Sequence, residues 1–464
     1  MRWNSKRSET PLACSKTTTK PKKPPFFTVL LTAKTFFTTV SAPGRGMAQS
    51  GSALVLGTRG RGFESPFPDH LFFHAGIREI PYPQTDMNAL SATVLSTAML
   101  VFCLSCGETQ YIADTPPPID IIADTVEDVA RTNCVVTDQL TLGSIPVDPQ
   151  TGLSESFEFD LPGDSLSLLI VVRGASDTLY TLTSLTDPEG NVVVKDNWHQ
   201  GKNTAVCLAC PNRIAAFPGT HAALLPNAPN VTLRPGRWKA RYGAFQSLPF
   251  TPATDAADVR VFIKRGDELP ETGTLKLALF HRLDGPLDGP ATEEKRSQLT
   301  ADLSDVFAQA GVTISHTFNP LPDLPPSGNR AALPALGDTL PLGDDAVPVL
   351  MFDELFDGDN AITGFSPVPG GRTEFGGSLV AVQATSPQES KALGHVVAHE
   401  TGHYLGLWHT RESDGTGIVD PLPDTEIASD DNLMTPDLRG TVLTEMQSTI
   451  LRRHPLVRHT CPPR

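Results

Sequence analysis

Several features that define large functional classes are missing from this sequence. It has no P-loop and no dinucleotide-binding glycine fingerprint, and no internal repeat is visible. Basic residues are also scarce, with 37 Lys and Arg against 52 Asp and Glu and a formal net charge of −15. Because the phosphate backbone of nucleic acids repels an acidic surface, we do not expect nucleic acid as a partner.

Cysteine is sparse, and the chain has none between Cys210 and Cys461. Four of its seven cysteines lie beyond Cys106, namely Cys134, Cys207, Cys210 and Cys461. An even number in an oxidising compartment indicates disulfides, and the sequence leaves three pairings open. Cys207 and Cys210 also form a CxxC pattern. Neither a second CxxC nor a βαβ pattern accompanies it, so a redox or zinc role for this pair is not favoured.

The first 86 residues differ in composition from the rest of the chain. They hold 12 Lys and Arg against 5 Asp and Glu, and they show neither strand-like nor helical periodicity. Residues 47–66 resemble the conceptual translation of a transfer-RNA gene, which is typical of an over-extended reading frame. We therefore expect residues 1–86 to be a spurious or disordered leader and translation to begin at Met87. A basic nucleic-acid-binding arm is the alternative.

Residues 87–106 are typical of an export signal. An uncharged apolar run that begins at Ala89 has the length of a signal-peptide core and is short for a membrane span. Its end is similar to a bacterial lipobox, in which the cysteine, here Cys106, is lipidated and becomes the new N-terminus. Two features depart from that pattern, because Cys103 replaces the usual leucine and no Lys or Arg lies between Met87 and the run. We expect export, with Cys106 as a candidate lipidation site and residues 107–133 as a tether; an uncleaved anchor helix is the alternative.

The region 134–284 is predicted to be an all-β domain. Residues 157–161 alternate apolar and acidic side chains, and residues 165–172 are rich in strand formers. The runs at 259–263 and 275–280 supply later strands, and Pro, Gly and Asp turns separate them. Short strands of this kind predict a β-sandwich. The pattern resembles the jelly-roll-like accessory domains of secreted bacterial proteases, and we expect it to act as a spacer and folding support.

The region 285–464 is predicted to mix helices and strands. Apolar residues at helical spacing predict a helix over 292–310, and the runs at 347–352 and 378–382 are typical of strands. Residues 319–344 are rich in Pro, Leu, Gly and Asp. We expect them to form a long loop beside a cleft.

Two further helices of this region have recognisable starts. Ser386 is a suitable N-cap and proline is favoured at the first helical position, so a helix is expected over residues 387–405. Thr444 and Gln447 form a capping-box pattern that opens a last helix.

The segment from His399 to His409 carries the strongest functional signal in the chain. His399 and His403 are four residues apart, so a helix places both imidazoles on one face. Gly406 can adopt the left-handed backbone that ends a helix and lets the chain turn, which would bring His409 to the same ion. Three nitrogen ligands leave a fourth position open. An open position distinguishes a catalytic zinc site from a structural one.

Glu400 follows the first of these histidines and is predicted to be the general base. It is poorly placed to bind the same ion and well placed to take a proton from a zinc-activated water and return it to a leaving amine. The expected reaction is hydrolysis of a peptide bond. His395 precedes His399 by four residues and could compete as a ligand, but that choice would leave Gly406 without a role. We expect His395 to lie on the surface or beside the ligands.

The pattern of these residues resembles the metzincin clan of zinc endopeptidases. That resemblance implies an α+β catalytic domain and a methionine-containing turn below the metal. Met434 is the candidate, because it lies 25 residues after His409 and is followed by Thr435 and Pro436, which favour a tight turn. The resemblance also implies that the strand before the active-site helix, here residues 378–382, lies at the sheet edge and pairs with extended substrate.

Residues 420–425 are similar to the acidic D-x-x-D-T segment of the pappalysin-like branch of that clan. In that branch the segment is associated with calcium and with paired cysteines, and this chain has no cysteines there. We therefore expect the acids of this loop to be solvated, and a calcium requirement stays open. The acids concerned are Asp414, Asp420, Asp424, Asp430 and Asp431.

These patterns together predict a multidomain, exported bacterial protein in which a β-sandwich precedes a metzincin-like domain over residues 285–464. We expect it to hydrolyse protein or peptide substrates with Zn²⁺, and to contact a membrane only through a lipid anchor at the cell envelope; secretion without an anchor is the alternative. A non-catalytic cell-surface binding or adhesive lipoprotein that retains the zinc fold is the alternative function. The sequence leaves open the cleavage preference and the oligomeric state.

Overall fold

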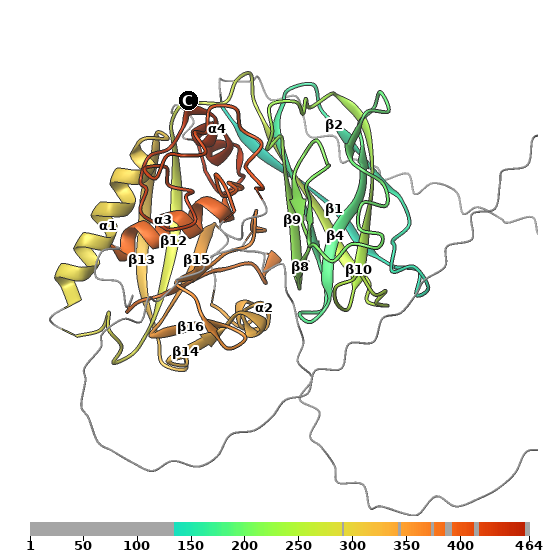
Figure 1. The fold of residues 1–464 in the computed structure, drawn as a ribbon. Coiled ribbons are helices and arrows are strands. Elements are labelled where there is room, and N and C mark those ends of the chain that lie inside the picture. Colours follow the sequence, from blue (N-terminus) through green and yellow to red (C-terminus); the bar gives the residue numbers. More distant parts are fainter. Residues whose placement is uncertain are drawn as a thin grey trace, which may run out of the picture. The chain divides into compact units, whose positions relative to one another are not determined.

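The computed structural model describes residues 134–289, 292–341, 345–372, 375–385, 392–412 and 417–459 (Figure 1). The predictions for the leader, for the export signal with Cys106 and for the tether lie outside these residues. None of the described helices combines the length and the hydrophobicity that a membrane span requires. In its described part the protein is β-rich, with few helices.

Two antiparallel sheets form the first region. One has the strand order β1-β11-β3-β9, and the other has the order β2-β10-β4-β5, with β8 also paired to β4. The strands are β1 (Val136–Ile145), β2 (Phe157–Leu161), β3 (Ser165–Arg173), β4 (Leu179–Thr186), β5 (Val192–Val194), β8 (Phe217–Pro218), β9 (Thr220–Leu225), β10 (Gly236–Phe245) and β11 (Ala257–Arg265). One cluster of buried side chains draws on both sheets, so the two sheets share a core. Strand β2 alternates buried and exposed residues, which confirms the alternation predicted for residues 157–161.

Strand β3 is buried on both faces, and this explains its continuous apolar sequence. Leu168 and Ile170 belong to the core between the two antiparallel sheets. Leu169 and Val171 point the other way and belong to a second core, which contains residues of the C-terminal region. The sheet that contains β3 is therefore shared by two hydrophobic cores.

A short hairpin of the first region is closed by a disulfide. Its strands are β6 (Val206–Cys207) and β7 (Ile214–Ala215). Cys207 and Cys210 are bonded to each other, and Cys134 is disulfide-bonded as well. Of the three pairings that the sequence left open, the structure therefore selects the one that contains the Cys207–Cys210 bond. Cys461 lies outside the described residues.

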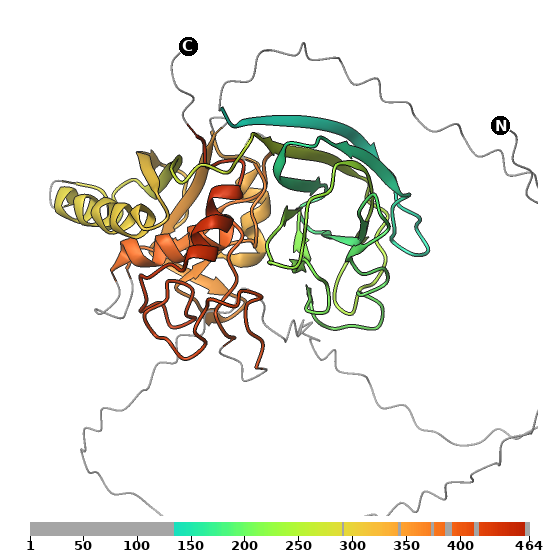
Figure 2. The ribbon, with the colours of Figure 1, turned by 90° about the horizontal axis from the view of Figure 1, so that it is seen from above.

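A mixed sheet with the strand order β13-β12-β15-β19-β18 organises the second region. Its strands are β12 (Gly273–Arg282), β13 (Val312–Leu321), β15 (Ala346–Phe352), β18 (Gly364–Phe365) and β19 (Val380–Gln383). All neighbours are parallel except β18, which runs antiparallel to β19. Helices α1 (Glu293–Ala308) and α3 (Leu393–Tyr404) lie side by side in both views and contact the sheet through β13 and β19 (Figures 1 and 2).

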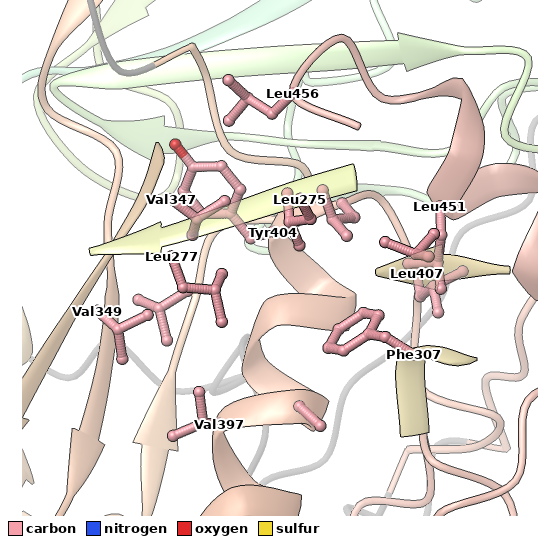
Figure 3. Packing of buried hydrophobic residues seen from close by; sticks show 14 of the residues in the cluster. Leu275, Leu277, Phe307, Val347, Val349, Val397, Tyr404, Leu407, Leu451 and Leu456 are labelled. Atoms are coloured by element: carbon pink, nitrogen blue, oxygen red, sulfur yellow. The ribbon is translucent and has the colours of Figure 1, made fainter. Parts of the chain in front are cut away.

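Both faces of the mixed sheet are buried. On one face, Leu275 of β12 and Val347 of β15 belong to the same core as Phe307 of α1, Val397 of α3 and Leu451 of helix α4, which spans Glu445–Arg453 (Figure 3). On the other face, Leu350 of β15 belongs to one core with Leu333 of α2 (Leu333–Gly337) and Leu355 of β16 (Glu354–Asp357). The neighbouring short elements are β14 (Ser327–Asn329) and β17 (Asn360–Ala361), which both pair with β16, and the 3₁₀ helix η2 (Arg330–Ala332), which precedes α2. The two covered faces explain the continuous apolar run of β15.

Several predictions of secondary structure are confirmed in this region. The helix expected over residues 292–310 is α1, and the runs at 347–352 and 378–382 coincide with β15 and β19 within two residues. Helix α4 opens with the predicted capping box, in which Thr444 accepts a hydrogen bond from the backbone of Gln447 while the Gln447 side chain accepts one from the backbone of Thr444.

Two predictions about the placement of strands are wrong. The run at 275–280 was assigned to the first region, but it is β12 and pairs with β13 and β15. The change from one region to the other therefore falls within residues 266–272, before the predicted boundary at 284. Residues 378–382 were expected at the sheet edge, but β18 pairs with the outer side of β19 and takes the edge position. A strand of only two residues gives no periodicity that a sequence could reveal.

Two further expectations are corrected by local structure. Residues 319–344 do not form one long loop, because they include the end of β13 together with β14, η2 and α2. The helix expected over residues 387–405 begins at Leu393, since Ala392 has an extended backbone. Gly394 lies against Asp302 of α1, where an added Cβ would come within 2.4 Å of the Asp302 Cβ. Close packing between two helices thus fixes the first turn of α3. The proposed cap at Ser386 lies outside the described residues.

Lys264 of β11 links the first region to helix α4. Its side chain is buried, with 1% of the residue exposed. The ammonium donates hydrogen bonds to the carbonyls of Arg452, His454 and Val457, at 2.5, 2.9 and 2.8 Å. These carbonyls lie at and after the end of α4, where helical carbonyls lack intrahelical partners and a positive charge is favourable.

Replacing Lys264 with methionine should lower the free energy of unfolding by about 3 kcal/mol or more, because three buried carbonyls lose their donor. Urea unfolding measures the change, and Lys239→Met on the exposed side of β10 is the matched control. A loss as small as that of the control would show that water satisfies these carbonyls equally well.

Candidate metal centre

Three buried imidazoles converge at the end of helix α3. His399 and His403 lie one turn apart on that helix, and His409 approaches from the chain that follows it. The Nε2 atom of His409 lies 3.2 Å from Nε2 of His399 and 3.1 Å from Nε2 of His403. Each of the three residues is at most 2% exposed. The structure thus brings the three histidines selected from the sequence into one cluster that could bind a metal ion.

A sharp turn at Gly406 brings the third histidine to the other two. Helix α3 ends at Tyr404, and Gly406 has a φ of +107°, a backbone conformation that side chains disfavour. A Cβ at this position would also come within 2.9 Å of Leu224, a residue of β9. The turn is therefore restricted to glycine both by its own backbone and by the neighbouring sheet.

Each imidazole is oriented by a hydrogen-bond acceptor at its other nitrogen. Nδ1 of His399 lies 2.7 Å from the Leu433 carbonyl, and Nδ1 of His403 lies 2.8 Å from the Leu407 carbonyl. Carbonyl oxygens only accept, so both Nδ1 atoms donate and both Nε2 atoms carry lone pairs. Nδ1 of His409 lies 3.2 Å from the carboxylate of Glu412, which sets the same tautomer there.

The donor set fits a tetrahedral zinc ion. Zinc–nitrogen bonds of about 2.0–2.1 Å at tetrahedral angles place two ligand nitrogens about 3.3 Å apart, close to the spacings between these Nε2 atoms. Three lone pairs that face one another repel, and a cation between them converts that repulsion into attraction. Burial and the neighbouring imidazoles also hold the pKa of His403 well below its usual range, so this ring is neutral at pH 7, as a ligand must be.

Glu400 lies beside the cluster and against the edge strand of the mixed sheet. It follows His399 on helix α3 and is 3% exposed. Gly364 of β18 approaches it so closely that an added Cβ would lie 2.5 Å from its Oε1 atom. A side chain at residue 364 would therefore displace the carboxylate. The sequence analysis did not identify Gly364, and no motif could have revealed it.

Met434 lies directly below helix α3. A Cβ on Gly402 would come within 2.9 Å of the Met434 sulfur, and Met434 is fully buried. The carbonyl of Met434 accepts a hydrogen bond of 3.0 Å from the backbone of Thr410, the residue after His409. Leu433 is the residue whose carbonyl orients His399. Two consecutive carbonyls of this turn therefore hold the first histidine of the cluster and the segment of the third.

A buried amide pair fixes the turn that contains Met434. The side chains of Asn432 and Gln447 exchange two hydrogen bonds, of 2.9 and 3.1 Å, and Asn432 also accepts a hydrogen bond of 2.9 Å from the backbone of Met434. Gln447 is the capping-box residue of α4. The start of the last helix is thereby joined to the turn below the histidines, a link between residues 15 positions apart that the sequence analysis missed.

The expectation of solvated acids after His409 is wrong for Asp420, which is 7% exposed. Burial raises the pKa of its carboxyl to about 6. Asp424 accepts a hydrogen bond from the backbone of Met446 in the first turn of α4, and Asp430 pairs with Arg411. In the described part of the chain the acids form no metal-binding group of their own, and Asp414 lies outside it.

His395 does not join the cluster. It lies on α3 one turn before His399, is half-buried, and is not a member of the group of three converging histidines. The choice of His409 over His395 as the third nitrogen therefore agrees with the observed geometry.

No protein-family model matches the chain, and no curated protein matches it. Among solved structures it is similar to metalloproteinase-II from Bacteroides fragilis, at 15% identity and a TM-score of 0.28, with 43% of this chain and 63% of that chain covered. The chain thus spans less than two thirds of that protein. A family two carbohydrate esterase from Cellvibrio japonicus is matched at 9% identity and a TM-score of 0.12, over 48% of this chain and 81% of that chain. At such low TM-scores neither similarity supports an argument about fold or function.

Replacing Gly364 with alanine should lower the free energy of unfolding by about 1–3 kcal/mol, because the new methyl group overlaps the buried Glu400 carboxylate. Gly163→Ala is the matched control, since the nearest atom to its added Cβ lies 4.0 Å away. Urea unfolding of both variants measures the difference. Equal stability would mean that Glu400 moves aside without cost.

Replacing Glu412 with glutamine should weaken metal binding by about 10- to 100-fold, because His409 loses the charged acceptor that orients its ring. Competition with a chromophoric zinc chelator measures the affinity. The exposed Glu155→Gln serves as the control. If the two variants compete equally well, Glu412 has no part in metal binding.

Proposed function

We propose that the protein is an exported zinc-dependent endopeptidase that hydrolyses peptide bonds in protein or peptide substrates. One observation carries this proposal: three buried imidazoles present lone pairs to one point, each fixed by an acceptor at its other nitrogen, with Glu400 beside them. The metal ligands would be His399, His403 and His409.

Zinc bound there would supply a Lewis acid for the substrate carbonyl and would lower the pKa of water to about 7. Glu400 would accept a proton from the attacking water and return it to the leaving amine, which is general acid–base catalysis. Met434 would support the ligands from below. Strand β18 lies at the edge of the mixed sheet, so extended substrate would bind by pairing with it as an additional strand, and the absence of a side chain at Gly364 would leave room for the Glu400 carboxylate.

We further propose that the first region is a jelly-roll-like β-sandwich and the second a metzincin-like domain of the α+β class. The strand orders β1-β11-β3-β9 and β2-β10-β4-β5, which share one core, support the first assignment. The order of α1, the mixed sheet, the histidine-bearing α3, the Met434 turn and α4 supports the second.

Translation would begin at Met87, residues 87–106 would be the export signal, Cys106 would be the lipidated residue, and residues 107–133 would be the tether from the cell envelope. The disulfide-bonded state of Cys134, Cys207 and Cys210 supports an oxidising compartment. Zinc is the only cofactor in this proposal, and nucleic acid is not a partner.

The test is cleavage of a proteome-derived peptide library by the purified protein, beside Glu400→Gln prepared with matched zinc content. We expect the parent to cleave and the variant to lose about 10²- to 10⁴-fold in rate, because it lacks the base. Glu155→Gln should cleave as the parent does. If the parent binds zinc and cleaves nothing, the protein is a zinc-containing binding protein and the proposed enzymatic function is wrong.

A further inference from the structure

Arg213, a residue of the first region, contacts the segment that carries His409 through the Trp408 ring. It lies at the return of the β6–β7 hairpin, directly before β7, and the Cys207–Cys210 disulfide closes the same hairpin. The proposed function assigns no role to this residue, and the sequence analysis did not identify it.

The backbone of Arg213 is held by a pair of buried asparagines. The Asn227 side chain accepts a hydrogen bond of 3.1 Å from the Arg213 N–H and donates one of 2.6 Å to its carbonyl. Asn212 accepts a hydrogen bond of 3.0 Å from the backbone of Asn227 and donates another of 3.0 Å to the carbonyl of Leu224. Asn212 and Asn227 are at most 1% exposed. The starting point of the Arg213 side chain is therefore fixed relative to β9.

The guanidinium of Arg213 is directed at the segment that carries the third histidine. Its Cζ atom lies 5.5 Å from the centre of the Trp408 ring, a cation–π distance, and Trp408 immediately precedes His409. Its charge also interacts favourably with the carboxylates of Asp420 and Glu412. Glu412 is the acceptor for Nδ1 of His409.

The two carboxylates that interact with the charge of Arg213 are both largely buried, and a buried carboxylate requires a compensating cation. The Glu412 side chain is 10% exposed, and Asp420 is 7% exposed. Without Arg213 these carboxylates would lose that compensating charge, and movement of their loop toward solvent would relieve the cost. Such a movement would change how Glu412 holds His409.

We infer that Arg213 is a positioning residue for the metal centre: it holds Glu412 against His409 by charge and fixes Trp408 by stacking. The first region of the protein would then support the residues that orient His409, beyond the role of spacer expected from the sequence. This inference rests on metal binding by the three histidines, which is part of the proposed function, but it does not require peptide cleavage.

The experiment compares the whole protein with Arg213→Met, which removes the charge and keeps much of the stem, and with Arg213→Lys, which keeps the charge. Arg237→Met is the control, because its guanidinium lies on the exposed side of β10. The first readout is the rate of zinc loss to excess chelator. The second is the visible spectrum of the Co²⁺-loaded protein, which reports ligand geometry and which a loss of global stability alone would leave unchanged.

We expect Arg213→Met to lose zinc about tenfold faster than the parent and to shift the Co²⁺ spectrum as Glu412→Gln does. Arg213→Lys should stay within about threefold of the parent, because charge carries most of the effect. In the Glu412→Gln background, Arg213→Met should change the rate of zinc loss and the Co²⁺ spectrum little further, since both substitutions break the same connection from Arg213 through Glu412 to His409.

A parent-like loss rate and spectrum in Arg213→Met would overturn the inference. Equal defects in Arg213→Lys and Arg213→Met with an unchanged Co²⁺ spectrum would also overturn it, because they would indicate packing alone. Should Arg213→Met fail to fold, Arg213→Gln replaces it as the variant without the charge and is compared with Arg213→Lys, which keeps the charge. A parent that binds no metal would refute the proposed function itself, whereas a parent that binds zinc without cleaving peptides leaves this test intact.

Discussion

The arrangement of the site depends on two adjacent carbonyls, those of Leu433 and Met434. The first orients the imidazole of His399, and the second accepts a hydrogen bond from Thr410 and so fixes the segment that begins after His409. Both carbonyls belong to the turn that packs below helix α3 at Gly402. Because one turn positions both His399 and the segment after His409, a movement of that turn would change the distance between these two histidines.

The turn is rigid because distant parts of the protein support it. The Asn432–Gln447 pair joins it to α4, and Lys264 of the first region holds the other end of that helix. Leu224, also of the first region, lies under the Gly406 turn. Residues of both regions therefore position the histidines. The two regions are joined by a hydrophobic core that contains residues of each.

Residue spacing and capping patterns predicted the parts of the site that are formed by residues close together in the chain. Helical spacing places His399 and His403 on one face, a glycine at residue 406 allows the turn, and the capping box starts α4 at Thr444. The contacts that complete the site join residues far apart in the chain, and no single-sequence signal reports them. Arg213 meets the His409 segment from another sheet, and the edge position of β18 follows only from how β19 pairs. Among the residues that the sequence analysis missed, Glu412 could have been identified, because it lies three residues after His409 and contacts that ring.

The most direct test of this account is X-ray absorption spectroscopy of the zinc-loaded protein at the zinc edge. The convergence of three Nε2 atoms predicts a first shell of about four nitrogen and oxygen atoms at about 2.0 Å, with the outer-shell scattering of three imidazole rings. A shell that contains sulfur at about 2.3 Å, or one composed of oxygen without imidazole scattering, would contradict it.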